Sequence, residues 1–442
     1  REAALTGLPV ALHAELCAFL AALHDLGKIS VVFQAKCRDL WPSDVLGQCP
    51  ERTSQRYGHW QATAVLLNAA DVKAALRPVF GEAGIPPSLI PAIAGHHGKA
   101  PIGDYSNAEP WLAAQDTEIG PVCVAVAAKL CDELVALFPN LNGLKMARRL
   151  ANCSFALNGL ITLADWVGSD LDHFRFVDPS MSIEDYWRLA LEVADRALAN
   201  KGLAPARSRA AGLAELSSHA QAPRPMQART ATLAITDEPQ IVVIEDGTGS
   251  GKTEAALVLA ARMMAAGLGE GIFVALPTMA TANAMHGRLD KAMGGLFDGP
   301  SSLVLAHGKA VLANALARLA QIHVDEPDSV AAHFNAWIGD SRKKAFFADA
   351  GAGTIDQAFL SILPKKHLTM RQYALAGRIL IVDEAHACDG YMGEELNRLL
   401  EMQARLGGSA IVLSATLNRA VRDALIQSFS EGRQLRTGLG KE

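Results

Sequence analysis

A glycine-rich segment near the middle of the sequence constrains the fold more than any other stretch. It reads Ile241-Val-Val-Ile-Glu-Asp-Gly-Thr-Gly-Ser-Gly-Lys-Thr253. Its β-branched residues predict a buried parallel strand, and the residues from about Thr253 to Met264 predict a helix. A strand, a glycine loop and a helix N-terminus in this order form a phosphate-binding cradle, because the backbone N–H groups and the helix dipole attract an anion. The segment therefore predicts an α/β domain that binds a nucleotide.

The residues of this loop have distinct expected roles. Lys252 is expected to reach the β- and γ-phosphates of ATP, and Thr253 is expected to hold Mg²⁺. The strict P-loop pattern has glycine where Asp246 stands, so what remains is the shorter form found in helicases. The expected ATP-binding residues of the loop are Thr248, Gly249, Ser250, Gly251, Lys252 and Thr253. A plain glycine turn is the alternative, but a lysine-threonine pair at a helix start has no packing role.

Length, charge and cysteine content limit the class of protein. The chain has 442 residues, half of them hydrophobic, which is enough for two to three domains with a sizeable core. Its net charge of −5 excludes a globally basic surface but leaves room for a local positive groove. Seven cysteines without a C-x-x-C pair fit a reducing cytoplasm better than a disulfide scaffold. We expect no membrane span, since Lys129 and Arg262 interrupt the longest apolar runs.

The first two hundred residues are rich in alanine and leucine at helical spacing, and metal-binding residue types recur within them. A histidine-aspartate pair is expected at the end of an apolar helix, one histidine at a helix start, a histidine pair at a helix end or turn, and an aspartate inside an apolar helix. These residues are, in that order, His24-Asp25, His59, His96-His97 and Asp165. Each alone is more often an ordinary core or capping residue. Together they predict a metal site.

The chemistry of this set indicates which metals it would take. Imidazole and carboxylate ligands suit Mn, Fe, Ni, Co or Zn, and the absence of a nearby cysteine argues against a structural zinc site. Two such ions a few ångströms apart would activate a water molecule and stabilise both oxygens of a phosphoester displacement.

Beyond about residue 225 the pattern changes to alternating strands and helices, which predicts a parallel sheet. The candidate strands are Ile241–Ile244, Gly271–Ala275, Ser302–Ala306, Arg378–Val382 and Ala410–Leu413. Asp383 and Glu384 directly follow one of them and are expected to hold Mg²⁺ and to act as general base for ATP hydrolysis. The alternative is an acidic helix N-terminus. Gln227 is expected to read the adenine edge.

Three further segments at expected strand ends offer hydroxyl, amide and backbone groups for a nucleic-acid backbone. Their candidate residues are Pro277 and Thr278, Thr354 and Gln357, and Ser414 and Thr416, the last two linking the nucleotide site to the nucleic-acid track. Any one of these segments alone is more often a plain loop. Arg342-Lys343-Lys344 and Lys365-Lys366 are candidate basic contacts, although such runs are more often solvated surface.

These motifs together resemble a known family. The histidine-aspartate set is similar to that of the HD phosphohydrolase superfamily. Leu23-His-Asp-Leu-Gly-Lys28, Gly95-His-His-Gly98 and Ala164-Asp-Trp-Val-Gly-Ser169 resemble the nuclease domain of the type I CRISPR-associated HD nuclease–helicases. The resemblance implies two metals. His24, Asp25 and Asp165 would hold one, and His59, His96 and His97 the other, with Asp25 bridging them and Lys28 near the scissile phosphate.

The second half resembles the first RecA-like lobe of a superfamily 2 helicase of the same branch. Leu276-Pro-Thr-Met-Ala-Thr-Ala-Asn-Ala-Met285, Gly353-Thr-Ile-Asp-Gln357 and Asp383-Glu-Ala-His-Ala-Cys-Asp-Gly-Tyr-Met392 carry this likeness. The resemblance also implies a second RecA-like lobe and a C-terminal domain, which the residues after Thr416 are too few to form. It implies a further metal-binding histidine upstream of Arg1. His13 is no substitute, since eleven residues of helix place it roughly 16 Å from His24.

The expected architecture is an all-α HD domain at 1–203, a linker at 204–225 and an α/β RecA-like lobe at 226–442. The resemblance implies a cytoplasmic, metal-dependent nuclease and ATP-dependent 3′–5′ translocase in type I CRISPR interference. Its partners would be single-stranded DNA and a guide-RNA surveillance complex, and its ATPase would be incomplete in this chain. One alternative is an HD nucleotide phosphohydrolase with a regulatory ATPase domain. Another is a non-catalytic recruitment fragment, which would bind no transition metal.

Overall fold

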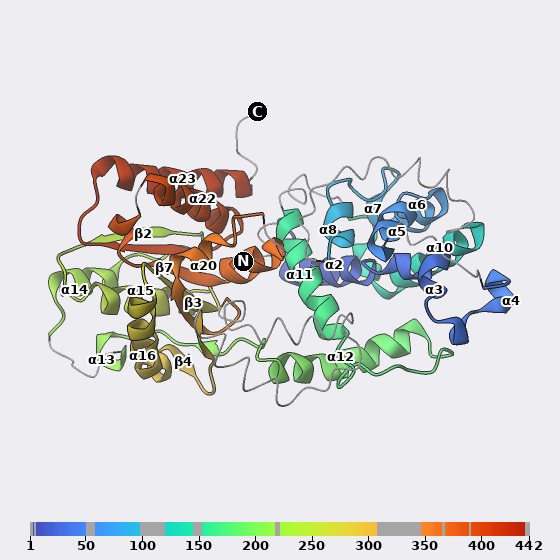
Figure 1. The fold of residues 1–442 in the computed structure, drawn as a ribbon, viewed down its shortest axis with the longest axis horizontal. Coiled ribbons are helices and arrows are strands. Elements are labelled where there is room, and N and C mark those ends of the chain that lie inside the picture. Colours follow the sequence, from blue (N-terminus) through green and yellow to red (C-terminus); the bar gives the residue numbers. More distant parts are fainter. Residues whose placement is uncertain are drawn as a thin grey trace. The chain divides into compact units, whose positions relative to one another are not determined.

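The chain forms two compact units in a computed structural model (Figure 1). The described residues are 3, 6–49, 58–97, 120–144, 153–216, 222–306, 346–364, 367–388 and 390–437. The helical unit comprises Thr6–Asp165 and Phe176–Leu191, and the sheet unit comprises Arg1–Leu5, Trp166–Arg175 and Glu192–Glu442. The expected order, a helical N-terminal region followed by a parallel α/β domain, is confirmed. The domain boundaries drawn from the sequence stay a prediction.

The helical unit is built from short helices around an aromatic core. In chain order its helices are α2 (Val10–Ala22), η1 (Leu26–Ile29), α3 (Val31–Gln34), η2 (Arg38–Leu40), α4 (Ser43–Leu46), α5 (His59–Leu66), α6 (Ala70–Ala75), α7 (Arg77–Phe80), α8 (Ile90–Ala94), α10 (Gly120–Leu137), η4 (Pro139–Leu141) and most of α11 (Ser154–Gly168). Phe19 of α2 is fully buried, and its ring centroid lies 6.1 Å from that of Phe80 and 5.8 Å from that of Phe138. Such tilted and edge-on pairs add stability to the apolar burial itself.

One segment of this unit meets the length and hydropathy requirement for a membrane span, contrary to the expectation from the sequence. Val10–Ile29 has a mean hydropathy of 1.3, and 44% of it is buried within the protein. The continuous helix α2 ends at Ala22, and the rest of the segment carries His24 and Asp25. A core helix of a globular unit passes the same test, so the finding is weak support for a membrane segment.

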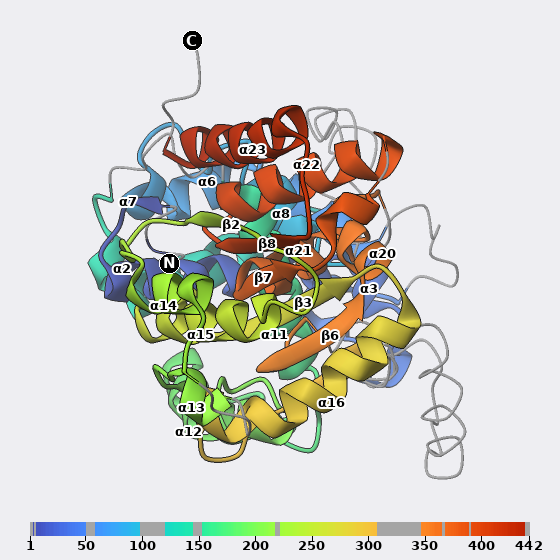
Figure 2. The ribbon, with the colours of Figure 1, turned by 90° about the vertical axis from the view of Figure 1, so that its left-hand side faces the viewer.

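The sheet unit contains a six-stranded, all-parallel sheet. Its strands are β2 (Ile241–Glu245), β3 (Gly271–Leu276), β5 (Leu303–Ala306), β6 (Ala350–Thr354), β7 (Arg378–Val382) and β8 (Ala410–Ser414). They lie in the order β2-β8-β7-β3-β6-β5, and Figure 2 shows the labelled strands of this series side by side. A parallel sheet places the carboxyl ends of all its strands at one edge, where ligands bind in such folds.

Helices cover both faces of this sheet. One face carries α15 (Lys252–Ala265) and α16 (Met279–Leu296), and alternate strand residues such as Ile272, Val274 and Leu276 pack with them in one buried core. The other side carries α20 (Ile355–Phe359), α21 (Leu368–Ala376), α22 (Gly390–Arg405) and α23 (Arg419–Thr437). Figure 2 shows α22 and α23 across the sheet from α15 and α16. Because both faces are covered, β3, β7 and β8 are buried along their whole length.

The five strands predicted from the sequence are present, but a sixth was missed. β6 reads Ala-Gly-Ala-Gly-Thr, a composition with little β-propensity, and it lies between β3 and β5. Gly353 is needed there, because a Cβ at this position would lie 2.8 Å from the carbonyl oxygen of Ala306. Gly353 and Thr354 end this strand, so the Thr354 segment lies at a strand end, although no strand before it was predicted.

The segment expected to be a linker also contains ordered structure. After α12 (Ile183–Asn200), β1 (Arg207–Ser208) pairs antiparallel with β4 (Phe297–Asp298), and α13 (Leu213–Leu216) follows. Ala211 and Leu216 are buried in the same core as α15 and α16. The helix α14 (Pro225–Thr232) then leads into β2. Most of this segment therefore packs on the sheet unit.

Candidate metal centre and nucleotide site

The turn that carries His24 and Asp25 is hydrogen-bonded to helix α5. α2 ends just before His24, and the short helix η1 follows Asp25. Thr63 Oγ1 of α5 accepts a hydrogen bond from Gly27 N (2.9 Å) and donates one to the carbonyl oxygen of His24 (2.9 Å). A Cβ on Gly27 would lie 1.9 Å from the carbonyl oxygen of His59, so only glycine permits this approach. The contact brings the start of α5, with His59, beside Asp25.

The other predicted metal ligands lie on two further helices of the same unit. His96 and His97 follow directly after α8, and Asp165 lies in the last turns of α11. The buried Asn158 of α11 donates a hydrogen bond to the carbonyl oxygen of Ala92 in α8 (2.9 Å). Asn158 and Asp165 are two helical turns apart and share a face of α11. This bond therefore turns the face that carries Asp165 toward the histidine pair.

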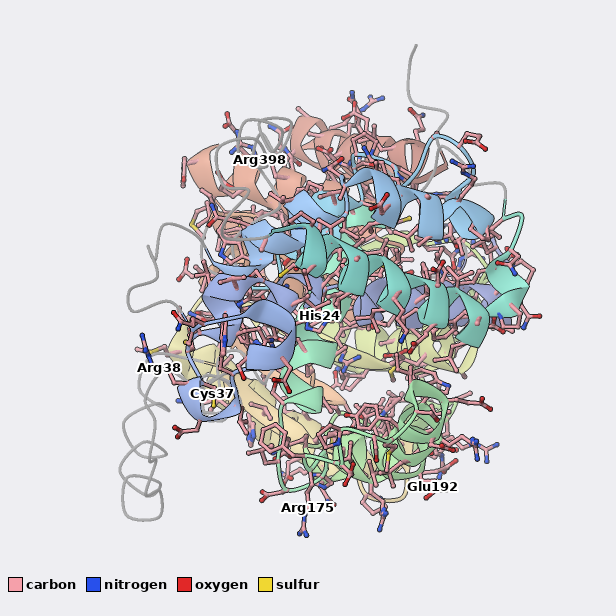
Figure 3. The ribbon with its side chains drawn as sticks, turned by 90° about the vertical axis from the view of Figure 1, so that its right-hand side faces the viewer. His24, Cys37, Arg38, Arg175, Glu192 and Arg398 are labelled. Atoms are coloured by element: carbon pink, nitrogen blue, oxygen red, sulfur yellow. The ribbon has the colours of Figure 1, made fainter. Side chains whose placement is uncertain are left out.

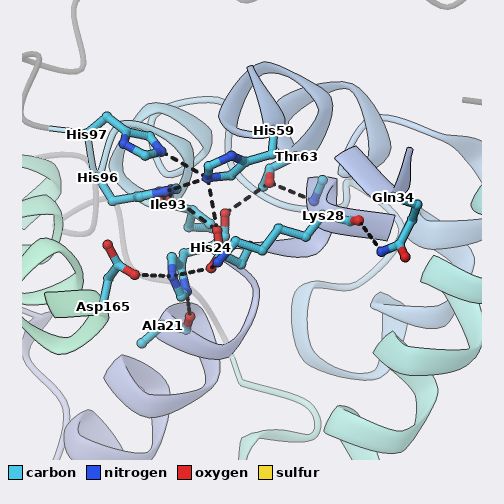
Figure 4. A network of polar contacts seen from close by, with 12 residues as sticks. Ala21, His24, Lys28, Gln34, His59, Thr63, Ile93, His96, His97 and Asp165 are labelled. Carbon is cyan, nitrogen blue, oxygen red and sulfur yellow. Dashed lines mark hydrogen bonds and ion pairs between the residues drawn. The ribbon is translucent and has the colours of Figure 1, made fainter. Parts of the chain in front are cut away.

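Three imidazole rings converge through their Nε2 atoms (Figure 4). The Nε2 atom of His59 lies 2.9 Å from His97 Nε2 and 3.4 Å from His96 Nε2. It also lies 3.3 Å from Asp25 Oδ1. The Nε2 atom of His59 carries at most one proton and can donate it to only one of these three neighbours. Lone pairs of the other atoms therefore lie close together at the centre. Such crowding of acceptors is the arrangement that a cation stabilises.

A second group meets at the same aspartate. His24 Nε2 lies 3.1 Å from Asp25 Oδ2 and 3.4 Å from Asp165 Oδ1. Asp25 thus has one oxygen near each group of imidazoles. The ligand sets that the resemblance implies are brought together in this geometry, with Asp25 between them. Their roles as ligands stay predictions.

The ring orientations of two histidines suit metal binding. His24 Nδ1 donates to the carbonyl oxygen of Ala21 (2.6 Å), and His96 Nδ1 donates to that of Ile93 (3.3 Å). A carbonyl can only accept, so Nδ1 carries the proton in both rings. The Nε2 atoms are therefore directed at the centre, as in metal-ligating histidines that are oriented by an outer hydrogen bond.

The pKa values show where this site stabilises positive charge. Burial alone lowers the pKa of His24, but hydrogen bonds and charge attraction from Asp165 and Asp25 raise it to about 10. Burial and neighbouring histidines lower the pKa of His96 to about 3 and that of His97 to about 4. These two rings are therefore neutral at pH 7, with lone pairs available. Burial opposes ionisation of Asp25, but its bonds with His24 and His59 hold its pKa well below the usual range.

These residues fit a metal centre by a further criterion. Among the described residues, His24 Nε2 and Asp25 Oδ1 are buried atoms that make no hydrogen bond of good geometry. Ligand atoms of His59, His96 and His97 lie within 4.8 Å of one another, as do those of His24, Asp25 and His96. Neither group contains a cysteine, as the sequence led us to expect. Buried polar atoms that lack a well-formed hydrogen bond are costly, and a metal would satisfy both.

Lys28 is a partly exposed cation at the centre. Lys28 forms an ion pair with Asp25 Oδ2, and its side chain is 37% exposed, so it can also meet an anionic ligand. Figure 3 shows His24 among the helices of the unit, whereas Cys37 and Arg38 lie at the periphery.

His13 lies in the core, where its ring contacts Thr6 Oγ1 (3.0 Å) and Cys17 Sγ (3.5 Å). This agrees with the expectation that His13 is not a ligand.

The phosphate-binding loop follows β2 as expected, and α15 begins at Lys252. Gly249 and Gly251 adopt φ of +76° and +89°, which only glycine tolerates easily. The ammonium of Lys252 donates to the carbonyl oxygens of Asp246 (2.6 Å) and Gly247 (3.0 Å). Lys252 is thus turned into the loop, where an anion would meet it.

Two residues from α14 and just before it contact the same loop. Gln227 Nε2 donates to the carbonyl oxygen of Gly251 (3.3 Å), and Arg224 donates to that of Gly249 (2.6 Å). Gln227 Oε1 also accepts from the backbone of Arg224 (3.0 Å). The predicted adenine-reading glutamine therefore lies at the loop, while Arg224 carried no signal in the sequence.

The acidic pair lies where the strand order predicts. β7 is paired with both β3 and β8, so Asp383 emerges between the ends of those strands. Burial and the neighbouring Glu384 raise the pKa of Asp383. Glu384 adopts φ of +54°, and its carboxylate lies 3.2 Å from His386 Nδ1. His386 Nδ1 lies 3.1 Å from Ser414 Oγ, so His386, which the sequence analysis left without a role, bridges Glu384 and the predicted coupling segment.

The other predicted nucleic-acid contacts fall at neighbouring strand ends. Leu276 is paired with Thr354, so Pro277 and Thr278 emerge beside the start of α20, which carries Gln357. Gln357 Oε1 is buried without a hydrogen-bond partner among the described residues. Ser414 Oγ donates to the carbonyl oxygen of Thr416 (3.1 Å). The two basic runs, 342–344 and 365–366, lie outside the described residues.

Comparisons with known proteins agree with this geometry. The family "Cas3, HD domain" matches residues 1–174, and the family "DEAD/DEAH box helicase" matches residues 224–424. The CRISPR-associated endonuclease/helicase Cas3 of Escherichia coli is 31% identical over 440 residues. The Cas3 of Thermus thermophilus is 34% identical over 445 residues.

The chain carries a Cas3-type HD domain and a DEAD/DEAH-box helicase domain.

Solved Cas3 structures show the same fold. The T. fusca Cas3-ATP structure superposes with a TM-score of 0.79 at 28% identity, over 98% of this chain and 47% of that one. The match to the E. coli Cas3 covers 93% of this chain but 48% of that protein, so the chain spans about half the length of these relatives. A chain of a "CRISPR RNA-guided surveillance complex, pre-nicking" superposes with a TM-score of 0.66 at 25% identity. Over the matched residues the chain is thus Cas3-like, and its HD domain implies a bound metal.

Proposed function

We propose that this chain contributes two activities to type I CRISPR interference. One is metal-dependent cleavage of single-stranded DNA in the helical unit. The other is binding and hydrolysis of ATP in the sheet unit, as part of a 3′–5′ DNA translocase. The observation that carries the first is the convergence of four imidazoles and two carboxylates, in which the buried atoms His24 Nε2 and Asp25 Oδ1 make no hydrogen bond of good geometry.

The residues at this centre divide the work of phosphodiester hydrolysis. His59, His96 and His97 would hold one divalent transition metal, and His24 and Asp165 would hold a second, with Asp25 touching both groups. When bound, such ions lower the pKa of water and neutralise charge on a phosphate. The neutral state of His96 and His97 at pH 7 keeps their lone pairs available. Mn, Fe, Ni, Co and Zn all suit these ligands.

Lys28 is the cation that an incoming DNA strand would meet at the centre. Its ammonium contacts Asp25 and lies 5.7 Å from the Phe33 ring centroid, which orients it beside the carboxylate. A scissile phosphate between Lys28 and the metal ions that these residues would hold would have positive charge on both sides. The sheet unit would grip the sugar-phosphate backbone of the same single strand with little sequence readout. Pro277, Thr278, Thr354 and Gln357 are the proposed contacts there.

The partners follow from the relatives. A solved relative is part of a guide-RNA surveillance complex, so we propose that this chain, in the cytoplasm, acts on the strand that such a complex displaces. Because the chain spans about half the length of its relatives, we propose that full ATP turnover and translocation require a counterpart of the relatives' other half. The HD nucleotide phosphohydrolase alternative predicts instead a preference for mononucleotides over DNA.

The two sites should be separable by one substitution in the phosphate-binding loop. Lys252→Ala removes the ammonium that faces the loop carbonyls. We therefore expect the variant to lose its affinity for nucleotide, measured with a fluorescent ATP analogue. Cleavage of free circular single-stranded DNA with Mn²⁺ and without ATP should stay within about twofold of the parent chain, because the metal centre and the phosphate-binding loop lie in separate units and share no residue.

Lys291→Ala serves as the charge-matched control, since this exposed lysine lies on α16. A Lys252→Ala variant that stopped cleaving free single strands would contradict separate sites. A parent chain that cleaved mononucleotides but not DNA would favour the phosphohydrolase alternative.

A further inference from the structure

Arg288 on helix α16 reaches the first turn of α15, where the phosphate-binding loop ends. Its Nη1 donates a hydrogen bond to Thr253 Oγ1 (3.2 Å). Its Nη2 forms an ion pair with Glu254 Oε1 (2.5 Å). Thr253 is the residue expected to hold the Mg²⁺ of a bound nucleotide. The guanidinium therefore lies beside the proposed metal position, although Arg288 is distant from the loop in sequence.

The charges around this contact make it sensitive to what the loop binds. Arg288 also lies close enough to Asp383 for its charge to act on that carboxyl, together with Lys252 and against the larger effects of burial and Glu384. A guanidinium in this position is stabilised by Glu254 and Asp383. A divalent cation at Thr253 would repel it, and nucleotide phosphates would compete with Thr253 for its N–H donors. Binding of a magnesium nucleotide must therefore weaken the Arg288–Thr253 bond.

The same helix carries a proposed DNA contact at its other end. α16 begins after Thr278, whose hydroxyl accepts a hydrogen bond from Thr281 N (3.2 Å) and so caps the helix. Thr278 and Arg288 are about 15 Å apart along the helix axis at 1.5 Å per residue. Between them, Ala282 and Met285 are buried in the core that α16 shares with the sheet. A shift of α16 at Arg288 is therefore transmitted to Thr278 through one packed helix.

We propose that Arg288 is a positioning residue that links nucleotide binding at Thr253 to the single-stranded DNA contact at the start of α16. This inference rests on the proposed ATP and DNA sites of the sheet unit. Coupling between two ligands is reciprocal, so DNA binding must change nucleotide affinity by the same factor. We expect a factor of at least about 5 in the parent chain, the lower end of typical couplings.

The Arg288→Ala variant should lose this coupling while keeping both binding sites. The side chain of Arg288 is 45% exposed, so its removal leaves no cavity in the core. Loss of the contact leaves Thr253 free for Mg²⁺, so nucleotide binding should need no more Mg²⁺ than in the parent chain. The coupling factor should fall to about 1. Arg288→Lys retains the charge but cannot contact Thr253 and Glu254 through two separate nitrogens, so we expect an intermediate coupling factor.

The test is a set of fluorescence-anisotropy titrations of a labelled oligothymidylate, with and without a saturating non-hydrolysable magnesium ATP analogue. The control is Lys291→Ala, which removes a positive charge one turn farther along α16 and should keep the parental coupling. Parental coupling in Arg288→Ala, or a parent chain that binds both ligands without coupling, would overturn the inference. So would a rise in the Mg²⁺ requirement of Arg288→Ala, which would assign Arg288 to phosphate binding instead. A parent chain that binds neither ligand would instead refute the proposed function itself.

Discussion

Replacing Asp25 with asparagine should abolish metal-dependent cleavage of single-stranded DNA while the helical unit stays folded. Asp25 is the carboxylate that touches both imidazole groups, through Oδ1 to His59 and His96 and through Oδ2 to His24. Asparagine has the same shape but no charge, so it cannot balance two cations. Removal of an outer-shell partner of a metal ligand typically lowers activity about 10–100-fold. Removal of a bridging ligand should therefore lower activity further.

The measurement is the rate of cleavage of circular single-stranded DNA in the presence of Mn²⁺, with bound metal determined by elemental analysis. Asp71→Asn is the matched control, because Asp71 is an exposed carboxylate on α6 of the same unit. Circular dichroism should show unchanged helicity in both variants. Parental cleavage by Asp25→Asn at full metal occupancy would contradict the proposed bridging role.

Replacing Glu384 with glutamine should lower ATP turnover by at least about 100-fold, the lower end for loss of a general base. Glu384 follows the end of β7 with a left-handed backbone, which directs its carboxylate toward His386 rather than along the strand. Glutamine fills the same space but cannot accept a proton from water. Asp383 and Lys252 are unchanged, so nucleotide affinity should stay within a few-fold.

Phosphate release in the presence of single-stranded DNA measures this effect, with variants compared in chains of the same length. Glu394→Gln is the control, since Glu394 is an exposed carboxylate on α22. Retained turnover in Glu384→Gln would assign the base elsewhere. Lost nucleotide binding in that variant would show that Glu384 acts in binding rather than in proton transfer.

The sequence was most informative where local chemistry determines local structure. The strand, glycine loop and helix around Lys252 are as predicted, because glycine at positive φ and a run of β-branched residues admit few alternatives. The same holds for His59 at the start of α5 and for the histidine pair after α8. These positions could be predicted, whereas their convergence on Asp25 came from the resemblance, since it depends on contacts between distant helices.

The features that were missed depend on tertiary contacts. β6 was missed because alanine and glycine have low β-propensity, and only its place between β3 and β5 makes it a strand. Arg288 and Thr253 are far apart in sequence, and no local pattern marks the pair. The need for Gly27 is equally invisible in the sequence, because it arises from the α5 backbone that passes beside it.

The most direct test of the metal centre is cleavage of circular single-stranded DNA by the parent chain, first stripped of metal with a chelator and then titrated with Mn²⁺ in the absence of ATP. The stripped protein should be inactive, and activity should return as Mn²⁺ binds at the histidine cluster, because His59, His96, His97 and His24 converge on Asp25. Cleavage that persists in the stripped protein would contradict this account. So would a protein that binds Mn²⁺ at the cluster and leaves the DNA intact.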